Sequence, residues 1–356
     1  MKSNALKTGV VLVAVLLAAA SLQAQKPYRR GTTSGNFLEF GYGSAGNAMG
    51  DAAAGLSDDL SAVYWNPSGL ALMRQSGILF MMQPWIAGIN SAFAAGGLVV
   101  PGLGTFGISL LEVDYGREPV TTMDMQEGTG ENYSAADYCI SLSYARRLAQ
   151  WFAFGASAKM VSSRIWHCNA TAFAMDIGVR VNTDFFSPTG DRRDGLSIGM
   201  SISNYGTKMK FDGMDLLQPI DPDPYTSGEY DNVEGQYRPQ AWELPLLFRI
   251  GMAVHPLVNS FSRLTLAADA LHPNNNSESV NIGAQYEFNV HAFGTFYLRG
   301  GYKALFMPES YYGPSYGIGF LYRMPSANNM AIQVDYAYRD IDILGSVHSY
   351  TFSFLF

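Results

Sequence analysis

The chain ends with the stretch SVHSYTFSFLF, Ser346–Phe356, in which large apolar and small polar side chains alternate almost without a break. A side-chain period of two is that of a β-strand whose two faces differ chemically. The pattern separates four aromatic residues from three hydroxyl residues: Tyr350, Phe352, Phe354 and Phe356 on one face, and Ser349, Thr351 and Ser353 on the other. The aromatic face is too apolar for water. A β-barrel that spans a membrane is therefore the first hypothesis.

From Gln75 onward the chain divides into strand-like runs that are separated by turn residues. Runs of about ten residues with one polar and one apolar face match tilted transmembrane β-strands. We predict an all-β fold, a barrel of fourteen antiparallel transmembrane strands in the outer membrane. The strands are expected at 75–86, 89–99, 104–114, 138–147, 151–162, 170–183, 195–204, 243–255, 260–270, 278–289, 293–304, 311–324, 329–339 and 346–356.

The connections between these runs alternate between short and long. With both barrel ends at the periplasmic side, the two longest connections, 115–137 and 205–242, lie on the outside, as in bacterial outer-membrane proteins. A soluble β-sandwich or lectin-like barrel also alternates. We favour the membrane barrel because the polar faces mix both charge signs with Gly, Ser and Ala, which suits a hydrated lumen. The predicted lumen network is Arg180, Arg249, Asp269, Glu287, Arg299, Lys303, Asp335 and Arg339.

The N-terminus resembles a cleaved export signal, residues 1–24. Lys2 and Lys7 precede an apolar run, Gly9–Ala20, which is too short to cross a bilayer as a helix. Without Lys2 and Lys7, 21 of the 23 basic residues remain against 30 acidic ones. An acidic exported chain without a basic cluster argues against a nucleic-acid partner.

Motifs of catalysis and of cofactor or metal binding fail on their context. Gly41–Gly46 fits GxGxxG, but no βαβ unit surrounds it and position 66 is Asn rather than an acid. Gly313–Gly317 fits GxSxG, but the chain continues as a strand rather than turning into a helix. We therefore predict no enzyme, no cofactor and no metal site. An acidic cluster in the second long connection leaves a loose Ca²⁺ site as an alternative to a solvated loop: Asp221, Asp223, Glu229 and Asp231.

Two cysteines, Cys139 and Cys168, are expected at the outer ends of neighbouring strands. They could form a disulfide in an oxidising envelope if their Cα atoms approach within about 7 Å. The sequence leaves their pairing open.

Residues 25–74 do not form strand-like runs. They are rich in Gly, Ala and Asp and include an Asn66-Pro67-Ser68-Gly69 turn. Because this segment directly precedes the first strand, we predict that it folds back into the lumen as a hatch, with residues 75–356 forming the barrel. The alternative is a periplasmic tail, which would not need the apolar residues Val63–Trp65 and Leu70 so close together.

The hatch segment resembles the N-terminal hatch of the PorV/PorQ family, a branch of the FadL-like fourteen-stranded outer-membrane barrels. The resemblance rests on Gly50–Ala52, Asp58 and Trp65–Leu70, with Ser68 where the fatty-acid transporters have Ala. Further similar positions are Ser203–Gly206, Leu244-Pro245, Leu298–Lys303, Asp335–Arg339 and His348. The implied hatch motif is Asp51, Asp58, Trp65, Asn66, Pro67 and Gly69.

The resemblance implies an accessory or shuttle role in type IX protein secretion or surface attachment, with the translocon and secreted cargo as partners. The expected docking residues are the aromatic side chains of the second long connection: Tyr225, Tyr230, Tyr237 and Trp242. Phe356 resembles the signal that the barrel-insertion machinery reads before the chain enters the outer-membrane lipid. The alternative is passive uptake of hydrophobic molecules such as fatty acids. We rank it second because the lumen faces look polar, with Arg249, Gln285 and Arg299 among them.

Overall fold

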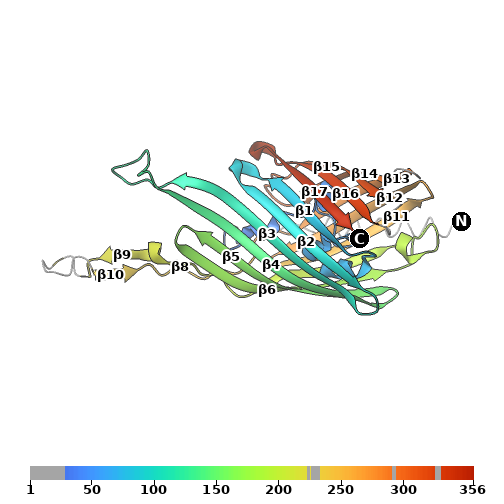
Figure 1. Cartoon of the computed structure of the whole chain (residues 1–356), viewed down its shortest axis with the longest axis horizontal. Coiled ribbons are helices and arrows are strands. Elements are labelled where there is room, and N and C mark those ends of the chain that lie inside the picture. Colours follow the sequence, from blue (N-terminus) through green and yellow to red (C-terminus); the bar gives the residue numbers. More distant parts are fainter. Residues whose placement is uncertain (1–28, 223–224, 226–232, 291–293, 325–329) are drawn as a thin grey trace.

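The computed structural model describes residues 29–222, 225, 233–290, 294–324 and 330–356, and the predicted export signal lies outside them. Fourteen antiparallel strands close into a barrel through the pairing of β5 with β6 (Figure 1). The wall strands are β1 Gly77–Pro84, β2 Asn90–Val100, β3 Gly104–Pro119, β4 Asn132–Ala149, β5 Phe152–Ile165, β6 Cys168–Asn182, β7 Ser197–Gly206, β11 Leu247–Val258, β12 Ser262–Pro273, β13 Ser279–Val290, β14 Gly294–Leu305, β15 Pro314–Arg323, β16 Ala331–Asp340 and β17 Ser346–Leu355. The predicted fold class is confirmed.

The two faces of each strand differ as the alternation requires. On β17, Tyr350 is 52% exposed on the outward face, while Ser349 and Thr351 are buried inside the barrel. β17 pairs with β1 from Gly77↔Leu355 onward, so the first and last strands form the closing seam. The outward apolar belt and the closed backbone ladder satisfy the two demands that a bilayer makes on a spanning chain. The chain is thus built as an outer-membrane β-barrel.

The first long connection is shorter than predicted, because β3 and β4 continue past the belt to Pro119↔Asn132. The polar residues Asp114–Arg117 lie in this extension, where the strand ladder shifts register between Asp114 and Arg117. Their polarity predicts a loop. The two strands nevertheless stay paired beyond the lipid, because backbone hydrogen bonds between strands do not require an apolar face. We call the end of the barrel that bears the long connections the outer end.

The second long connection contains short elements of its own. They are β8 Asp212–Gly213, η5 Met214–Leu216, β9 Leu217–Ile220 and β10 Val233–Gln236. β8 pairs with the outer end of β6, and β9 pairs with β10 in a two-stranded hairpin that projects from the barrel at the left of Figure 1. Other connections carry η3 Ile86–Gly88, η4 Arg192–Asp194 and η6 Asp342–Leu344.

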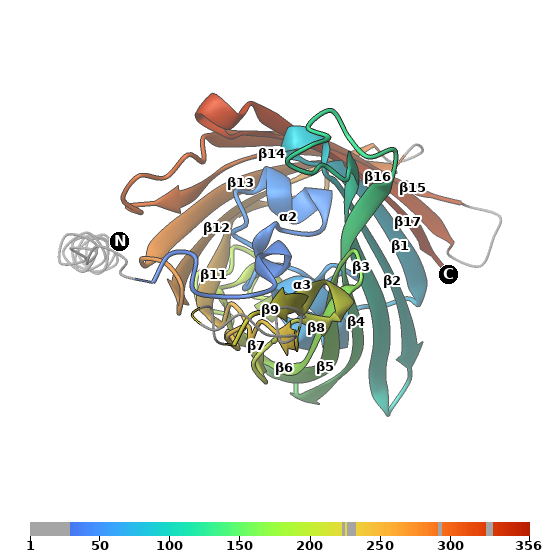
Figure 2. The ribbon, with the colours of Figure 1, turned by 90° about the vertical axis from the view of Figure 1, so that its left-hand side faces the viewer.

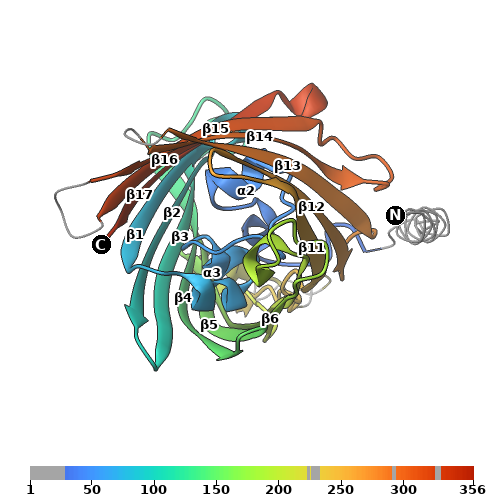
Figure 3. The same ribbon diagram turned by 90° about the vertical axis from the view of Figure 1, so that its right-hand side faces the viewer.

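The N-terminal segment lies inside the barrel, as the end-on views show (Figures 2 and 3). Its elements are η1 Asn36–Glu39, α2 Ser44–Ala48, α3 Ala62–Trp65 and η2 Pro67–Leu72. Arg30 forms a 2.8 Å ion pair with Glu309 in the outer β14–β15 connection, so the described chain begins at the outer mouth. It reaches the inner end where β1 begins. None of the described helices is long and apolar enough to cross a membrane.

Glycines on the inner face of the wall let the hatch backbone approach. A Cβ atom at Gly301 would lie 2.2 Å from the Met49 carbonyl carbon, and one at Gly155 would lie 2.4 Å from the Pro67 carbonyl carbon. At Gly199 a Cβ would lie 2.0 Å from the Ala54 oxygen. Such distances leave no room for any side chain, so glycine is required at these strand positions.

The lumen has two chemically different sides. Along β1–β6 the inward face carries an apolar cluster that packs against Leu60, Val63 and Leu70 of the hatch, together with buried polar side chains. Along β11–β16 it carries most of the predicted charged network. The residues on which the expectation of a mainly polar lumen rests come from the strands after β7, and along β1–β6 the inward face mixes polar and apolar side chains. The buried apolar wall residues of β1–β6 include Leu79, Met81, Phe93, Leu111, Val113, Cys139 and Val161.

Candidate functional site

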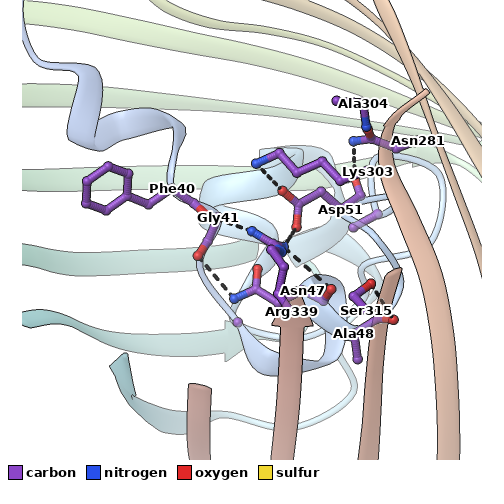
Figure 4. A network of polar contacts seen from close by, with 12 residues as sticks. Phe40, Gly41, Asn47, Ala48, Asp51, Asn281, Lys303, Ala304, Ser315 and Arg339 are labelled. Atoms are coloured by element: carbon purple, nitrogen blue, oxygen red, sulfur yellow. Dashed lines mark hydrogen bonds and ion pairs between the residues drawn. The ribbon is translucent and has the colours of Figure 1, made fainter. Parts of the chain in front are cut away.

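Asp51 of the hatch lies at the centre of a buried charge cluster (Figure 4). Its Oδ2 lies 2.8 Å from Lys303 Nζ on β14, and its Oδ1 accepts a hydrogen bond from Arg339 Nη2 on β16. Asp51 follows α2 with a left-handed backbone conformation (φ 65°), which turns its carboxylate toward the wall. Burial of one carboxylate with two cations is tolerated only because each charge is paired.

The same two cations also contact the hatch backbone and an aromatic ring. Arg339 Nη1 donates to the Phe40 carbonyl oxygen at 3.2 Å, and Lys303 Nζ lies 4.4 Å from the centre of the Tyr312 ring. Ser315 Oγ donates to the Ala48 carbonyl oxygen at 3.2 Å. These contacts join α2 to β14, β15 and β16, as Figure 4 shows.

A second set of predicted lumen residues binds the hatch backbone between α2 and the end of α3. The Asp269 carboxylate accepts from the Ala53 and Ala54 amides at 2.9 and 2.8 Å. Arg249 Nη1 donates to the Trp65 carbonyl oxygen at 2.9 Å, and its guanidinium lies 5.4 Å from the centre of the Trp65 ring. Arg180 Nη1 donates to the Ser57 carbonyl oxygen at 2.8 Å. Charged groups of the wall thus replace water for hatch backbone groups.

The Asn-Pro-Ser-Gly turn is a helix N-cap that also binds the wall. Asn66 Oδ1 accepts from the Ser68 amide at 3.2 Å, and Pro67 occupies the first position of η2. Asn66 Nδ2 donates to the Ala54 oxygen at 2.9 Å and to the Val179 oxygen on β6 at 3.2 Å. Gly69 has no room for a side chain, since a Cβ there would lie 2.2 Å from the Ser57 oxygen. This residue pattern therefore fixes a wall-anchored bend.

The remaining predicted lumen residues form a network on the wall. Arg299 Nη1 lies 2.6 Å from Asp335 Oδ1, and Arg299 Nε donates to Gln285 Oε1 at 2.6 Å. Gln285 Nε2 in turn donates to Glu287 Oε1 at 2.8 Å. Glu287, Arg299 and Asp335 are the last three of the eight predicted lumen residues. All eight lie on the inward face of the wall.

Asp58 of the predicted hatch motif is exposed, and its neighbour Asp59 has the structural role. Asp59 Oδ1 accepts from the Ser61 amide at 2.9 Å and from the Ser61 hydroxyl, directly before α3. Burial raises the pKa of the Asp59 carboxyl to about 6. The spacing Asp-x-Ser before an apolar turn is the signal that could have identified it.

A buried ion pair on β5 and β6 is missing from the predicted network. Lys159 Nζ lies 2.5 Å from Asp176 Oδ2 and donates to Asn204 Oδ1 at 2.9 Å. The backbone N–H of Asn204 donates to Asp176 Oδ1 at 2.8 Å. The inward positions of β5 and β6, read by their alternation, could have revealed this cluster.

The feature that sequence reasoning missed entirely is an apolar cavity at the outer mouth. It measures about 360 Å³ and lies between η1 of the hatch, the outer ends of β3–β5 and the segment before β8. Its apolar lining includes Phe37, Phe40, Ile165 and Phe211. A volume of this size is at the small end of ligand pockets, which span about 300–1,000 Å³. The lining comes from segments far apart in the sequence, so no local pattern indicates it.

The predicted docking aromatics are spread along the projecting connection. Tyr225 is 95% exposed and lies beyond the strands of the hairpin. The Tyr237 amide donates to the Leu216 oxygen at 2.9 Å, while Trp242 forms a bridge with Met209. Tyr230 lies outside the described residues. Binding of partner proteins by these aromatics stays a prediction.

Both cysteines are free and buried. The expectation that they lie on neighbouring strands is wrong, because β5 runs between β4, which carries Cys139, and β6, which carries Cys168. In the sheet, Cys139 lies opposite Val161, whereas Cys168 lies opposite Ile165 at the end of the strand. Within the described part of the chain, no group of three or more His, Cys, Asp and Glu side chains could hold a metal ion.

No protein-family model matches the sequence, and no curated protein matches it. The fold is similar to that of a FadL homologue of Pseudomonas aeruginosa, at 11% identity over 88% of this chain and 97% of that one, with a TM-score of 0.52. It is also similar to the toluene transporter TbuX of Ralstonia pickettii (12% identity, 88% and 97% covered, TM-score 0.51). The toluene transporter TodX of Pseudomonas putida gives 12% identity, 88% and 98% covered, and a TM-score of 0.54.

At such identities the similarity concerns the fold. It supports the FadL-like part of the resemblance and gives no support to the PorV/PorQ part. With its closed barrel and its hatch, the chain has the fold of the FadL-like outer-membrane barrels.

Proposed function

We propose that the chain is a passive outer-membrane channel for small hydrophobic molecules. The observation that carries this proposal is the apolar cavity at the outer mouth, which a molecule arriving from outside would meet first. Two of the similar barrels are named toluene transporters, which agrees with a small apolar cargo. Burial of apolar surface from water, worth about 25 cal/mol per Å², would drive entry into the cavity.

The apolar side of the lumen continues inward from the cavity. Leu111, Cys139 and Val161 pair with one another on β3, β4 and β5, one row deeper than Asp137, and are buried. Hydroxyl groups farther in bond to one another across the strands: Ser109 to Ser141, and Ser143 to Ser157 at 2.7 Å. These hydroxyl groups are therefore paired, and a molecule that moves along this side has to displace the hatch side chains that pack there.

The charged lumen residues do not oppose this proposal. Arg180, Arg249 and Asp269 bind hatch backbone groups, and Lys303 and Arg339 pair with Asp51. These side chains hold the hatch and are not free to face a cargo. The secretion role has less support, since no comparison favours it over transport.

The test is entry of radiolabelled toluene into cells whose outer membrane carries the protein. We expect Phe211→Glu, which puts a charge into the cavity lining, to lower the uptake rate at least about tenfold. Tyr237→Glu is the matched control, because it puts the same charge on the same connection outside the cavity, and it should leave uptake unchanged. Equal uptake by the wild type, Phe211→Glu and cells without the protein would refute the transport role.

A further inference from the structure

A hydrogen-bonded pair in the lining of the apolar cavity, Tyr115 and Asp137, points to the chemistry of the cargo. Asp137 lies on the inner face of β4, opposite Val113 on β3 and Ser163 on β5. The Tyr115 hydroxyl donates to Asp137 Oδ2 at 2.6 Å. Both residues line the cavity, so a carboxylate faces an otherwise mainly apolar space.

Asp137 retains capacity to accept a hydrogen bond. A carboxylate has about four lone-pair sites on its two oxygens, and the hydroxyls of Tyr115 and Ser163 use two of them. In the described part of the chain, no cation forms an ion pair with Asp137 within 4.0 Å, although Arg164 also lines the cavity. A ligand that donates a hydrogen bond would satisfy the carboxylate, whereas a ligand with its own carboxylate would be repelled.

The rest of the lining fits a single aromatic ring. Phe37, Phe40 and Phe211 surround the cavity, and Phe40 is held by a stacked contact with Trp85, with ring centres 4.3 Å apart and planes 9° apart. An apolar cavity of about 150 Å³ is enough to hold benzene. The cavity of about 360 Å³ therefore holds one ring with small substituents and is compact for a long alkyl chain.

We propose that the cargo is a monocyclic aromatic molecule with a hydrogen-bond donor, a ring hydroxyl or amino group, that donates to Asp137. The ring lies among Phe37, Phe40 and Phe211, and the donor points to the carboxylate beside Tyr115. This inference rests on the proposed channel function and narrows its substrate class. A hydrocarbon without a donor would displace water from Asp137 and leave the carboxylate without that hydrogen bond. The hydrocarbon should therefore bind more weakly than a ring that carries a hydroxyl or amino group.

The experiment measures binding of three probes of similar shape to the purified full-length protein in detergent by titration calorimetry. The probes are 4-methylphenol, its methyl ether 4-methylanisole, which cannot donate, and toluene. We expect 4-methylphenol to bind at least about tenfold more tightly than either of the others, as a hydrogen bond to a charged group allows. In Asp137→Leu this preference should disappear while toluene binding remains.

Asp114→Leu is the matched control, because Asp114 lies at the same level of β3 on the exposed side and does not line this cavity. It should keep the preference for 4-methylphenol, and all variants should keep the heat-dependent gel mobility of a folded barrel. Equal affinities for the three probes in the wild type, or an unchanged preference in Asp137→Leu, would overturn the inference and leave the channel function standing. Failure of all three probes to bind the wild type would remove both.

Discussion

At the scale of single residues, Asp51 shows how one carboxylate can fix a whole segment. Its two oxygens pair with Lys303 and Arg339, and all three side chains are largely buried. A third contact also holds Asp51 in place, because Asn281 Nδ2 donates to the Asp51 backbone oxygen at 3.3 Å. Removing one member of such a cluster leaves buried charge without a partner, which costs more than the pair contributes.

We therefore expect Asp51→Asn to loosen the hatch more than any surface substitution. The two unpaired cations should lower the free energy of unfolding by about 3–5 kcal/mol. Single-channel conductance in planar bilayers and the midpoint of thermal unfolding measure the effect; the former should rise and the latter fall. Asp58→Asn removes the same charge from an exposed hatch position and should change neither. If both variants behave like the wild type, the cluster does not hold the hatch.

Asp59 gives the hatch a pH dependence of defined sign. Its pKa is raised to about 6 from the ordinary value of 3.8 because burial disfavours the charged form. The folded state thus binds more protons than the unfolded one between these values, so stability falls as pH rises through this window. The loss approaches about 3 kcal/mol at most. Thermal unfolding at pH 4 and pH 7 should show a smaller difference in Asp59→Asn than in the wild type; an equal difference would assign the dependence elsewhere.

At the scale of elements, the hatch and the wall fit because the wall lacks side chains where the hatch comes closest. Gly301 faces Met49 and Gly50, while its neighbour Gly300 faces outward, where a Cβ would meet nothing nearer than 3.8 Å. Contact with the hatch therefore requires glycine at position 301 but not at position 300. One gives the hatch backbone its space, and the other is free to vary.

This difference makes a matched pair of variants. Gly301→Ala should destabilise the protein by about 1–3 kcal/mol, because the new methyl group overlaps the Met49 carbonyl. Gly300→Ala should stay within about 0.5 kcal/mol of the wild type, since surface substitutions without such an overlap usually do. Unfolding in guanidinium, followed by the gel mobility of the folded barrel, compares them. Equal midpoints would mean that the hatch can shift to make room.

The strands were predictable from sequence because their signal is local. Ser349, Thr351 and Ser353 are buried while Tyr350 and Phe352 are exposed, as alternation alone predicts. The outer extensions of β3 and β4 were not, because outside the lipid a strand needs no apolar face. The projecting β9–β10 hairpin was not predicted for the same reason.

At the scale of the whole molecule, charged side chains on one side of the lumen and an apolar cluster on the other both hold the hatch, and the outer-mouth cavity lies beside the apolar cluster. The predicted network on β11–β16 lies where alternation placed it. The cavity did not emerge from the sequence, because Phe37, Tyr115 and Phe211 come together only when three distant segments meet. The roles of Asp51 and Asn66 could be inferred as a hatch motif, but not their partners, which lie more than a hundred residues away on the wall.

The closing seam has a consequence for how the molecule is made. The hatch precedes β1, and the seam joins β1 to β17, with the Phe356 amide donating to the Ser76 oxygen at 2.9 Å. The barrel can therefore close only when the last strand is present, after the hatch and all the other strands. A wall that closes around a segment already in place never has to open wide enough to admit it. The inward glycines that face the hatch backbone, such as Gly155, Gly199 and Gly301, leave room for the hatch in one position only. A hatch in any other position would keep β1 from pairing with β17.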